Sequence, residues 1–212
     1  MRSATPRWEL LAREDEVLEP GAILLRGFVR AEAASLIQEI ERVAAAAPFR
    51  HMLTPGGFRM SVAMTNCGGL GWITDRRGYR YVAADPLSGR PWPVMPDPFR
   101  DLAARAAAAS GFADFAPDCC LVNRYRPDAR MAPHQDKDEA DFGAPIVSVS
   151  LGLPATFLWG GAERRDRPRR IPLESGDVVV WGGPARLNFH GVDTVAEGNE
   201  DCRYNLTFRK AK

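Results

Sequence analysis

The sequence predicts a mainly β protein with two helices, built as a sandwich, jelly roll or barrel. Short runs rich in β-branched and aromatic residues follow one another from Asp118 onward, and turn residues separate them. Two stretches, both before Asp118, place apolar residues at the three- and four-residue spacing of a helix. Strands and helices do not alternate along the chain as they would in a βαβ fold. The predicted strands lie near 119–126, 145–151, 155–159, 169–173, 177–182, 187–190 and 202–209.

The first half of the chain supplies the two helices and one further strand. Apolar residues near 22–29 predict a short first strand. A helix follows from about Glu32 to Ala46 and ends before a proline. The second helix begins at Asp97, which we expect to be its N-cap, and stops at Gly111. The apolar stripes of both helices predict that they cover a sheet or join a core.

Residues 50–95 are rich in proline, glycine and aromatic side chains, a composition that predicts hairpins and loops rather than long elements. Trp72, Tyr79 and Tyr81 alternate there with three arginines. A pocket for a flipped base or a single strand typically combines aromatic rings, which stack on bases, with guanidinium groups, which bind phosphates. The same aromatic residues would equally serve as the local core of an irregular region, so the residues alone leave both interpretations open.

Composition excludes several classes of protein. The chain has 212 residues, 45% of them hydrophobic and 26% charged, with a formal net charge of +1, so only a local patch could attract a polyanion. The four cysteines form no C-x-x-C pair and suggest no disulfide framework, which favours a reducing compartment. Residues 1–10 lack an apolar leader, and no apolar run approaches the roughly 18 residues of a membrane span. We therefore expect a soluble, cytoplasmic protein.

The clearest chemical signal is the pair His134 and Asp136, separated by one residue. In an extended segment, residues two apart project to the same side, so both side chains can reach one metal ion. His190, one of only three histidines in the chain, is a third candidate ligand. Two imidazoles and one carboxylate form the facial triad of non-haem Fe(II) oxygenases, which leaves positions open for co-substrate and O₂. Taken alone, such a pair more often marks a surface histidine near acidic side chains.

The segment 203–209 alternates polar and apolar residues, which places its polar side chains on one face of a strand. In a barrel that also holds the metal, arginines on that face would need anions, and a small dicarboxylate offers one carboxylate to each. The alternative is the solvent-facing side of an amphipathic strand. Asn123 and Tyr125, two apart on another predicted strand, could bind the same ligand or be satisfied within the sheet. The polar face of the last strand consists of Arg203, Asn205, Thr207 and Arg209.

Acidic and basic clusters flank these motifs. The spacing of Asp136, Asp138 and Asp141 does not match an EF-hand loop, so calcium is not expected. Asp138 could accept a hydrogen bond from the exocyclic amino group of a base, or remain a solvated loop carboxylate. The segment 163–170 carries five arginines that fit phosphate contacts, although an isolated charge run is more often a solvated loop.

Together these residues resemble the AlkB family of Fe(II)- and 2-oxoglutarate-dependent nucleic-acid demethylases, and most closely its bacterial DNA-repair members. The resemblance runs from about Met64 to Arg209, and the first 50 residues carry little of it. Runs of this length are far more specific than one histidine–aspartate pair. The resemblance is dense in Asn123-Arg-Tyr125, His134-Gln-Asp-Lys-Asp138, Pro145-Ile-Val-Ser-Val-Ser-Leu-Gly-Leu-Pro154, Gly176-Asp-Val-Val-Val-Trp-Gly-Gly183, His190-Gly191 and Asp201-Cys-Arg-Tyr-Asn-Leu-Thr-Phe-Arg209.

The resemblance implies a double-stranded β-helix (jelly-roll) core with N-terminal supporting helices and a nucleotide-recognition lid over its mouth. It implies one catalytic domain over 1–212, with the lid at about 50–95 and the core at about 118–210. The ligands implied for iron are His134, Asp136 and His190. Those implied for 2-oxoglutarate are Asn123, Tyr125, Arg203, Asn205 and Arg209. The residues implied to contact substrate are Trp72, which would pack on a flipped base opposite His134, together with Tyr79, Tyr81, Asp138 and Arg164.

The activity implied by the resemblance is oxidative demethylation with Fe(II), 2-oxoglutarate and O₂. An N-methyl group on a base such as 1-methyladenine or 3-methylcytosine would be hydroxylated and lost as formaldehyde, with succinate and CO₂ as further products. A lesion that already blocks pairing costs less to flip out of the stack. The implied partner is alkylated DNA, single- or double-stranded, or RNA, with no membrane and no obligate protein partner.

Two alternatives compete with this interpretation. One is a 2-oxoglutarate oxygenase of the same fold that acts on tRNA or on protein side chains. The other is a non-catalytic metal-binding barrel, which would have no use for the complete ligand set and both dicarboxylate-facing arginines. The residues alone do not rank DNA against RNA, or one methylated base against another.

Overall fold

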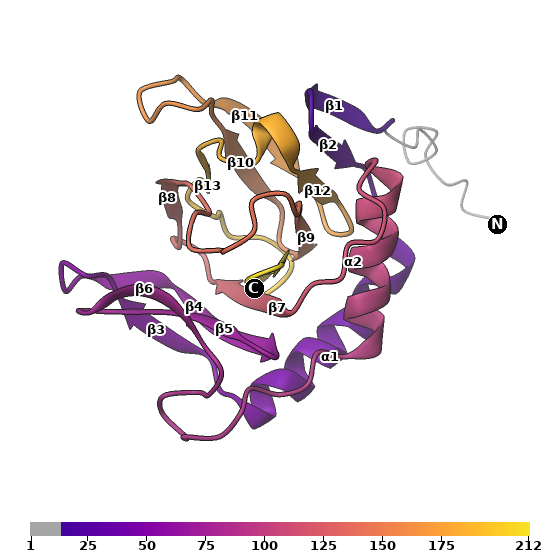
Figure 1. Ribbon diagram of the computed structural model, residues 1–212. Coiled ribbons are helices and arrows are strands. Elements are labelled where there is room, and N and C mark those ends of the chain that lie inside the picture. Colours follow the sequence, from indigo (N-terminus) through magenta and orange to yellow (C-terminus); the bar gives the residue numbers. More distant parts are fainter. Residues whose placement is uncertain (1–13) are drawn as a thin grey trace.

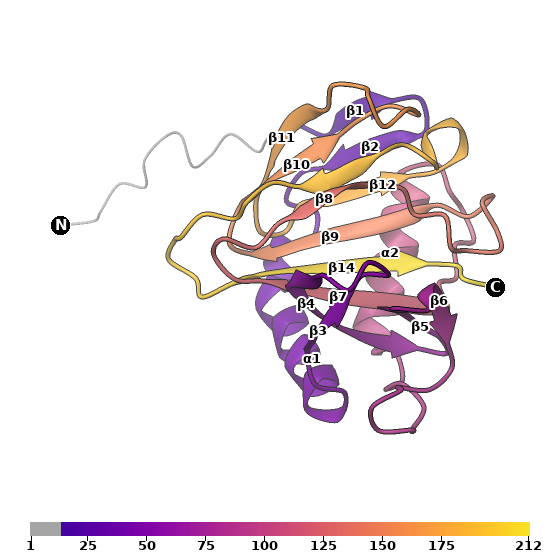
Figure 2. The ribbon, with the colours of Figure 1, turned by 90° about the vertical axis from the view of Figure 1, so that its left-hand side faces the viewer.

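Two antiparallel β-sheets face each other in the computed structural model, which describes residues 14–212 (Figures 1 and 2). The larger sheet consists, in spatial order, of β1 (Glu16–Glu19), β2 (Ala22–Leu25), β12 (Val178–Trp181), β9 (Ile146–Gly152), β14 (Arg203–Arg209), β7 (Cys119–Tyr125), β4 (Arg59–Gly68) and β3 (Arg50–Leu53). The smaller sheet consists of β11 (Arg169–Leu173), β10 (Ala155–Trp159), β13 (His190–Val192) and β8 (Met131–His134). The predicted mainly β class and its jelly-roll core are confirmed. The expectation about a leader concerns residues 1–10, which lie outside the described residues.

Alternation along the strands gives the larger sheet two different faces. On β12, Val178 and Val180 pack on the outer side, whereas Val179 and Trp181 join the core between the two sheets. Strands β12 and β9 are buried on both faces. Strand β12 reads as a continuous apolar run, whereas β9 carries the buried serines Ser148 and Ser150 at alternate positions. The inner face lies opposite the smaller sheet, so a functional site between the two sheets would form on this face.

Both predicted helices are present, and they cover the outer face of the larger sheet. Helix α1 (Ala33–Ala46) follows a short 3₁₀ turn, and α2 (Asp97–Ala109) precedes β7. Figure 1 shows both helices on one side of the molecule, away from β8, β10 and β13. The N-cap of α2 is Pro96 rather than Asp97, which is already helical and caps nothing with its side chain, so that prediction was wrong. Within residues 14–212, no helix is long and apolar enough to cross a membrane.

The prediction of only hairpins and loops over 50–95 was wrong in one respect. Strand β4 is ten residues long, and its second half, from Val62 to Cys67, is buried. It pairs with β7 on one side and β3 on the other, so the larger sheet supplies the order that the glycine-rich sequence does not suggest. The hairpin of β5 (Gly71–Asp75) and β6 (Gly78–Val82) forms a separate two-stranded sheet beside β4, as Figure 1 shows.

Candidate active site

His134, Asp136 and His190 lie together at one end of the smaller sheet. His134 ends β8, His190 begins β13, and the two are cross-strand partners with ring centroids 4.5 Å apart. The Asp136 carboxylate presents Oδ1 to the Nε2 of His134 and Oδ2 to the Nε2 of His190, each at 3.7 Å. One donor atom from each residue lies within 4.8 Å of the other two. The structure therefore brings together the three residues that the sequence singles out for a metal.

Backbone carbonyls fix which ring nitrogen faces the centre of this cluster. The Nδ1–H of His134 donates to the Ala132 carbonyl oxygen at 3.0 Å, and that of His190 donates to the Asn188 carbonyl oxygen at 3.0 Å. A carbonyl oxygen can only accept, so in the neutral form of each ring the proton lies on Nδ1. Each Nε2 is thereby left with a free lone pair, the form in which imidazole binds a metal.

The charges around the cluster keep its donors ready to bind a cation. Burial alone would raise the pKa of Asp136, but the Arg209 guanidinium and the two imidazoles hold it below its usual range. Arg209 donates from Nε at 3.0 Å and from Nη2 at 2.8 Å to Asp136 Oδ2. Burial, reinforced by His134, lowers the pKa of His190 to about 4, so this ring is neutral at pH 7. Two imidazoles and one carboxylate fit Fe(II) with positions left open.

The inner face of β14 and its neighbour β7 lies beside this cluster. Arg203 is the cross-strand partner of Tyr125, and Asn205 is the partner of Asn123. All four are buried, as is Arg209 at the end of the same face. The side chains cross-link the strands, because Asn123 Nδ2 donates to Asn205 Oδ1 at 3.1 Å and Arg203 Nη2 donates to Ser150 Oγ at 2.9 Å. The alternating face therefore points into the barrel and not into solvent.

Several donors on this face have no partner within the described residues. Arg203 is 1% exposed, yet its Nε and Nη1 make no hydrogen bond, and Arg209 Nη1 is in the same condition. A buried cation with only part of its donors satisfied is expensive, and burial lowers the pKa of Arg203 accordingly. Burial also raises the pKa of Tyr125 to about 12, so its hydroxyl stays protonated and can donate. This set of unused donors fits a small dicarboxylate such as 2-oxoglutarate.

The β5–β6 hairpin brings an aromatic platform to the same cluster. Trp72 and Tyr79 stack with ring centroids 5.6 Å apart and planes 17° from parallel, and Tyr79 is 50% exposed. Trp72 Nε1 donates to Asp138 Oδ2 at 2.8 Å, which ties the hairpin to a residue two positions after Asp136. A flat stacked pair beside a cation-binding cluster is suited to holding an aromatic ring over it.

Comparison with known proteins agrees with this geometry. The model of the 2OG-Fe(II) oxygenase superfamily matches residues 21–209. The chain is 56% identical to "Alpha-ketoglutarate-dependent dioxygenase AlkB" of Escherichia coli over 92% of this chain and 93% of that one. It is 30% identical to "DNA N(6)-methyladenine demethylase ALKBH1C" of Arabidopsis thaliana, over 92% of this chain and 49% of that one. The solved structure of OsALKBH1 superposes with a TM-score of 0.81 at 31% identity, over 92% and 99% of the two chains.

The chain belongs to the AlkB family of 2OG-Fe(II) oxygenases. As an AlkB-family member it is a 2-oxoglutarate-dependent dioxygenase whose cofactors are Fe(II), 2-oxoglutarate and O₂. The alternative of a non-catalytic barrel is therefore excluded. Family membership agrees with the donor set of the histidine–aspartate cluster and with the unpartnered arginine donors beside it.

Two buried residues of this AlkB-family site are not apparent from the sequence. Glu139 Oε2 forms an ion pair with Arg186 Nη2 at 3.0 Å, and its Oε1 lies 3.4 Å from Arg209 Nε. Arg186 also donates from Nη1 to the Asp136 carbonyl oxygen at 2.7 Å. Arg186 therefore holds the main chain of one predicted metal ligand, while Glu139 balances the charge of two arginines. Neither residue belongs to a periodic pattern; their only signal is proximity to Asp136 and His190 in the sequence.

Tyr81 and Arg164, both implied by the family resemblance to contact substrate, occupy different settings. The Tyr81 hydroxyl donates to Glu139 Oε1, so this side chain turns toward the buried ion pairs. Burial raises its pKa, which keeps the hydroxyl protonated. Arg164 is exposed in the loop after β10, with its guanidinium 5.9 Å from the ring of Phe189, the neighbour of His190. Tyr81 therefore anchors the hairpin, while Arg164 lies at the surface beside Phe189.

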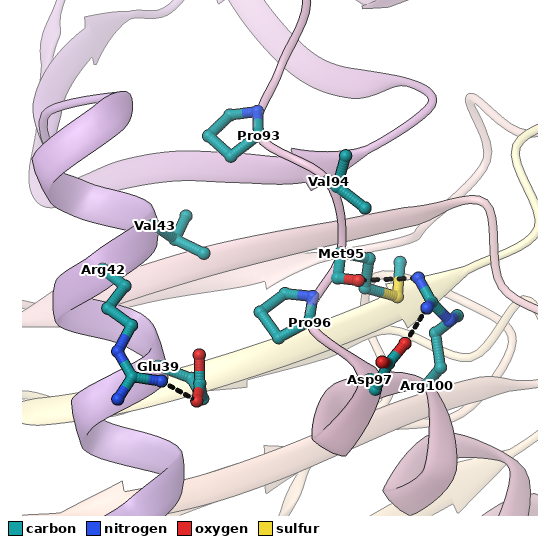
Figure 3. A pocket seen from close by; sticks show the side chains of 9 residues that line it. All are labelled: Glu39, Arg42, Val43, Pro93, Val94, Met95, Pro96, Asp97 and Arg100. Atoms are coloured by element: carbon teal, nitrogen blue, oxygen red, sulfur yellow. Dashed lines mark hydrogen bonds and ion pairs between the residues drawn. The ribbon is translucent and has the colours of Figure 1, made fainter.

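A groove of about 440 Å³ lies elsewhere, between α1 and the start of α2 (Figure 3). Its charged side chains are already paired, Arg42 with Glu39 and Arg100 with Asp97. The groove borders the helices that cover the outer face of the larger sheet, whereas His134 and its partners face the inner side. It is not the reaction site.

Proposed function

We propose that this chain is an oxidative demethylase that repairs N-alkylated bases, 1-methyladenine and 3-methylcytosine, in DNA, with RNA as a second candidate substrate. The observation that carries the proposal is the hydrogen bond from Trp72 to Asp138, because it ties the stacking platform to a residue two positions after the proposed metal ligand Asp136. The relatives named as a dioxygenase and as a DNA demethylase support the same substrate class. The basic residues of the loop 163–170 suit contacts to a phosphate backbone.

His134, Asp136 and His190 would hold Fe(II) through the two Nε2 atoms and one carboxylate oxygen. With both co-substrates bound, the site would couple oxidative decarboxylation of 2-oxoglutarate by O₂, yielding succinate and CO₂, to hydroxylation of an N-methyl group, whose product releases formaldehyde. The residues proposed to bind 2-oxoglutarate are Asn123, Tyr125, Arg203, Asn205 and Arg209.

The substrate side of the site is proposed to select the base. Trp72 offers a flat surface on which a flipped base can stack, and Tyr79 supports that surface from its other side. Asp138, which already accepts the Trp72 Nε1–H, can accept a further hydrogen bond from an exocyclic amino group. Adenine and cytosine carry such a group, whereas thymine does not. Tyr81 would line the pocket from the hairpin, and Arg164 would contact the phosphate backbone.

We further propose a single catalytic domain over 1–212, with about 50–95 as the nucleotide-recognition lid and about 118–210 as the core. Within that lid, β3 and β4 extend the larger sheet and the β5–β6 hairpin carries the platform. A cytoplasmic location is proposed because all four cysteines are free, three of them buried in reduced form.

The proposal is tested with an oligonucleotide that carries one 1-methyladenine. Protein loaded anaerobically with Fe(II) receives 2-oxoglutarate, ascorbate and air, and mass spectrometry follows the oligonucleotide while succinate is measured in parallel. Loss of one methyl group with one succinate is the expected result. Presenting the lesion in single-stranded DNA, duplex DNA and RNA ranks the substrates. Succinate without demethylation of any of the three would refute the proposed substrate class and favour a protein side chain.

Replacing Trp72 with alanine is expected to weaken binding of the methylated oligonucleotide, because base–aromatic stacking contributes about 1–3 kcal/mol per base. The measurement is the Kd of a fluorescent oligonucleotide in the presence of Mn(II) and 2-oxoglutarate, without turnover. Trp72→Phe keeps a smaller aromatic ring and lacks the Nε1–H bonded to Asp138, so comparison with the alanine variant separates stacking from positioning of that carboxylate. An unchanged Kd in the alanine variant would show that the platform does not hold the base.

A further inference from the structure

The turn between β1 and β2 reaches across to the segment that carries His190. Glu19, the last residue of β1, is partly buried and accepts two hydrogen bonds on one carboxylate oxygen, Oε1. Trp159 Nε1 donates to it at 2.6 Å, and Asn188 Nδ2 donates at 2.7 Å. Since β1 is an edge of the larger sheet and Trp159 ends β10 of the smaller one, a single carboxylate joins the two sheets.

Both donors to Glu19 adjoin His190. Trp159 is the cross-strand partner of His190 in the β10–β13 pair. Asn188 lies two residues before His190, and its carbonyl oxygen accepts the His190 Nδ1–H. Asn188 therefore contacts Glu19 through its side chain and His190 through its main chain. The carboxylate of Glu19 holds the residue whose carbonyl selects the tautomer of His190 and orients its ring.

The same turn makes a second, independent contact with this segment. The Gly21 carbonyl oxygen accepts the Gly182 N–H at 2.9 Å. Gly21 has φ +86°, and a Cβ there would lie 2.4 Å from the Gly182 carbonyl oxygen, so no larger residue fits without displacing the segment. Arg186, which donates to the Asp136 carbonyl oxygen, lies between these two points of contact. The turn thus supports a segment that contacts two of the three proposed metal ligands.

We propose that Glu19 is a positioning residue for the metal centre. By holding Asn188 and Trp159, it keeps the Nε2 of His190 directed toward Asp136. The inference rests on the proposed assignment of His134, Asp136 and His190 as ligands. It assigns a role in metal binding to the first strand, which lies outside the core segment of about 118–210. Loss of a partner that orients a metal-binding histidine typically weakens metal affinity about 10–100-fold.

The test is the binding of Mn(II) to metal-free protein under anaerobic conditions, followed by electron paramagnetic resonance of the free ion. Glu19→Ala is expected to raise the Kd for Mn(II) by about 10-fold. Glu19→Gln retains an oxygen acceptor for both donors and should stay within about 3-fold of wild type. The visible spectrum of the Co(II) form reports ligand geometry, and we expect it to change in Glu19→Ala and to be restored in Glu19→Gln.

Glu16→Ala is the matched control from the same strand. Glu16 pairs with Arg26 at 3.4 Å and Arg169 at 2.9 Å and makes no hydrogen bond to Trp159 or Asn188. It should leave the Mn(II) Kd unchanged, whatever its effect on the melting temperature. If Glu19→Ala does not fold, Asn188→Leu replaces it, because this variant removes the side-chain donor, keeps the backbone carbonyl, and is expected to weaken Mn(II) equally.

The outcomes separate the positioning role from the ligand assignment. Unchanged Mn(II) affinity in Glu19→Ala, or in Asn188→Leu if that variant is needed, overturns the positioning role. Equal losses in Glu19→Ala and Glu19→Gln overturn it too, because acceptance of the two hydrogen bonds would then not be the cause. If wild-type protein fails to bind Mn(II), or if His134→Ala binds it as tightly as wild type, the ligand assignment itself fails.

Discussion

Replacing His134 with alanine is expected to abolish succinate formation and to change the free energy of unfolding of the metal-free protein by less than about 0.5 kcal/mol. The His134 side chain is 40% exposed, and its Nδ1 bonds only a carbonyl oxygen two residues away. Its removal therefore leaves no deeply buried group without a partner, while one of three proposed iron ligands is lost. Succinate release and urea unfolding of the same preparation measure the two quantities.

Two further variants make this result specific. Asp136→Ala should also lose turnover, but unlike His134→Ala it should destabilise the protein. Arg209 would stay buried with Glu139 as its remaining carboxylate partner. Breaking a buried ion pair of this kind costs about 3–5 kcal/mol of folding stability. His51→Ala is the control for loss of a histidine, since His51 is exposed on β3 and bonds only the Met60 carbonyl oxygen. Turnover near the wild-type rate in His134→Ala would contradict the proposed iron ligands.

The Arg203→Met variant is expected to bind 2-oxoglutarate more weakly by about 2–5 kcal/mol, as is usual when one partner of a buried charge pair is removed. In the protein without co-substrate the same change should not lower the free energy of unfolding. Arg203 is buried there with two unpartnered nitrogen atoms, so methionine removes a desolvated charge and keeps most of the apolar volume. Titration calorimetry of the Mn(II) form and urea unfolding of the metal-free form give the two numbers.

Arg124→Met is the matched control for that experiment. Arg124 lies on β7, next to the partner of Arg203, but its guanidinium sits 4.3 Å from the ring centroid of Phe49 and belongs to the other face of the sheet. Its loss should leave the Kd for 2-oxoglutarate unchanged. If Arg203→Met also leaves that Kd unchanged, the co-substrate does not use the inner face of β14.

The parts of the site that the sequence predicts are those that follow a local period. The alternation over 203–209 fixes which side chains share a face, and the structure shows this face buried, with Arg203 inward. The pattern alone could not choose between the interior and solvent. The choice follows from the position of β14 between β9 and β7 in the middle of the larger sheet, which depends on pairing across more than fifty residues. The ligand roles of these residues remain predictions.

The parts that the sequence does not reveal depend on contacts between distant segments. Glu139 is a buried partner of Arg186 and Arg209, but in the sequence it looks like one more acid in a charged loop. Glu19 is equally hard to recognise from the sequence, because the residues that donate hydrogen bonds to it lie about 140 and 170 positions away. Strand β4 was missed since burial against β7, not residue propensity, makes it a strand. A side chain that affects a site only through a second residue produces no characteristic residue spacing in the sequence.

Strand β8 has consequences for how this protein keeps its iron. It is only four residues long and forms the open edge of the smaller sheet, paired on one side alone, with β13. The register of that pairing is irregular beside His190. An ion held jointly by His134 on β8 and His190 on β13 would act as a staple across the two strands. Pairing of β8 with β13 and retention of the ion would then be thermodynamically coupled. Any change that detaches β8 from β13 would therefore also release the metal.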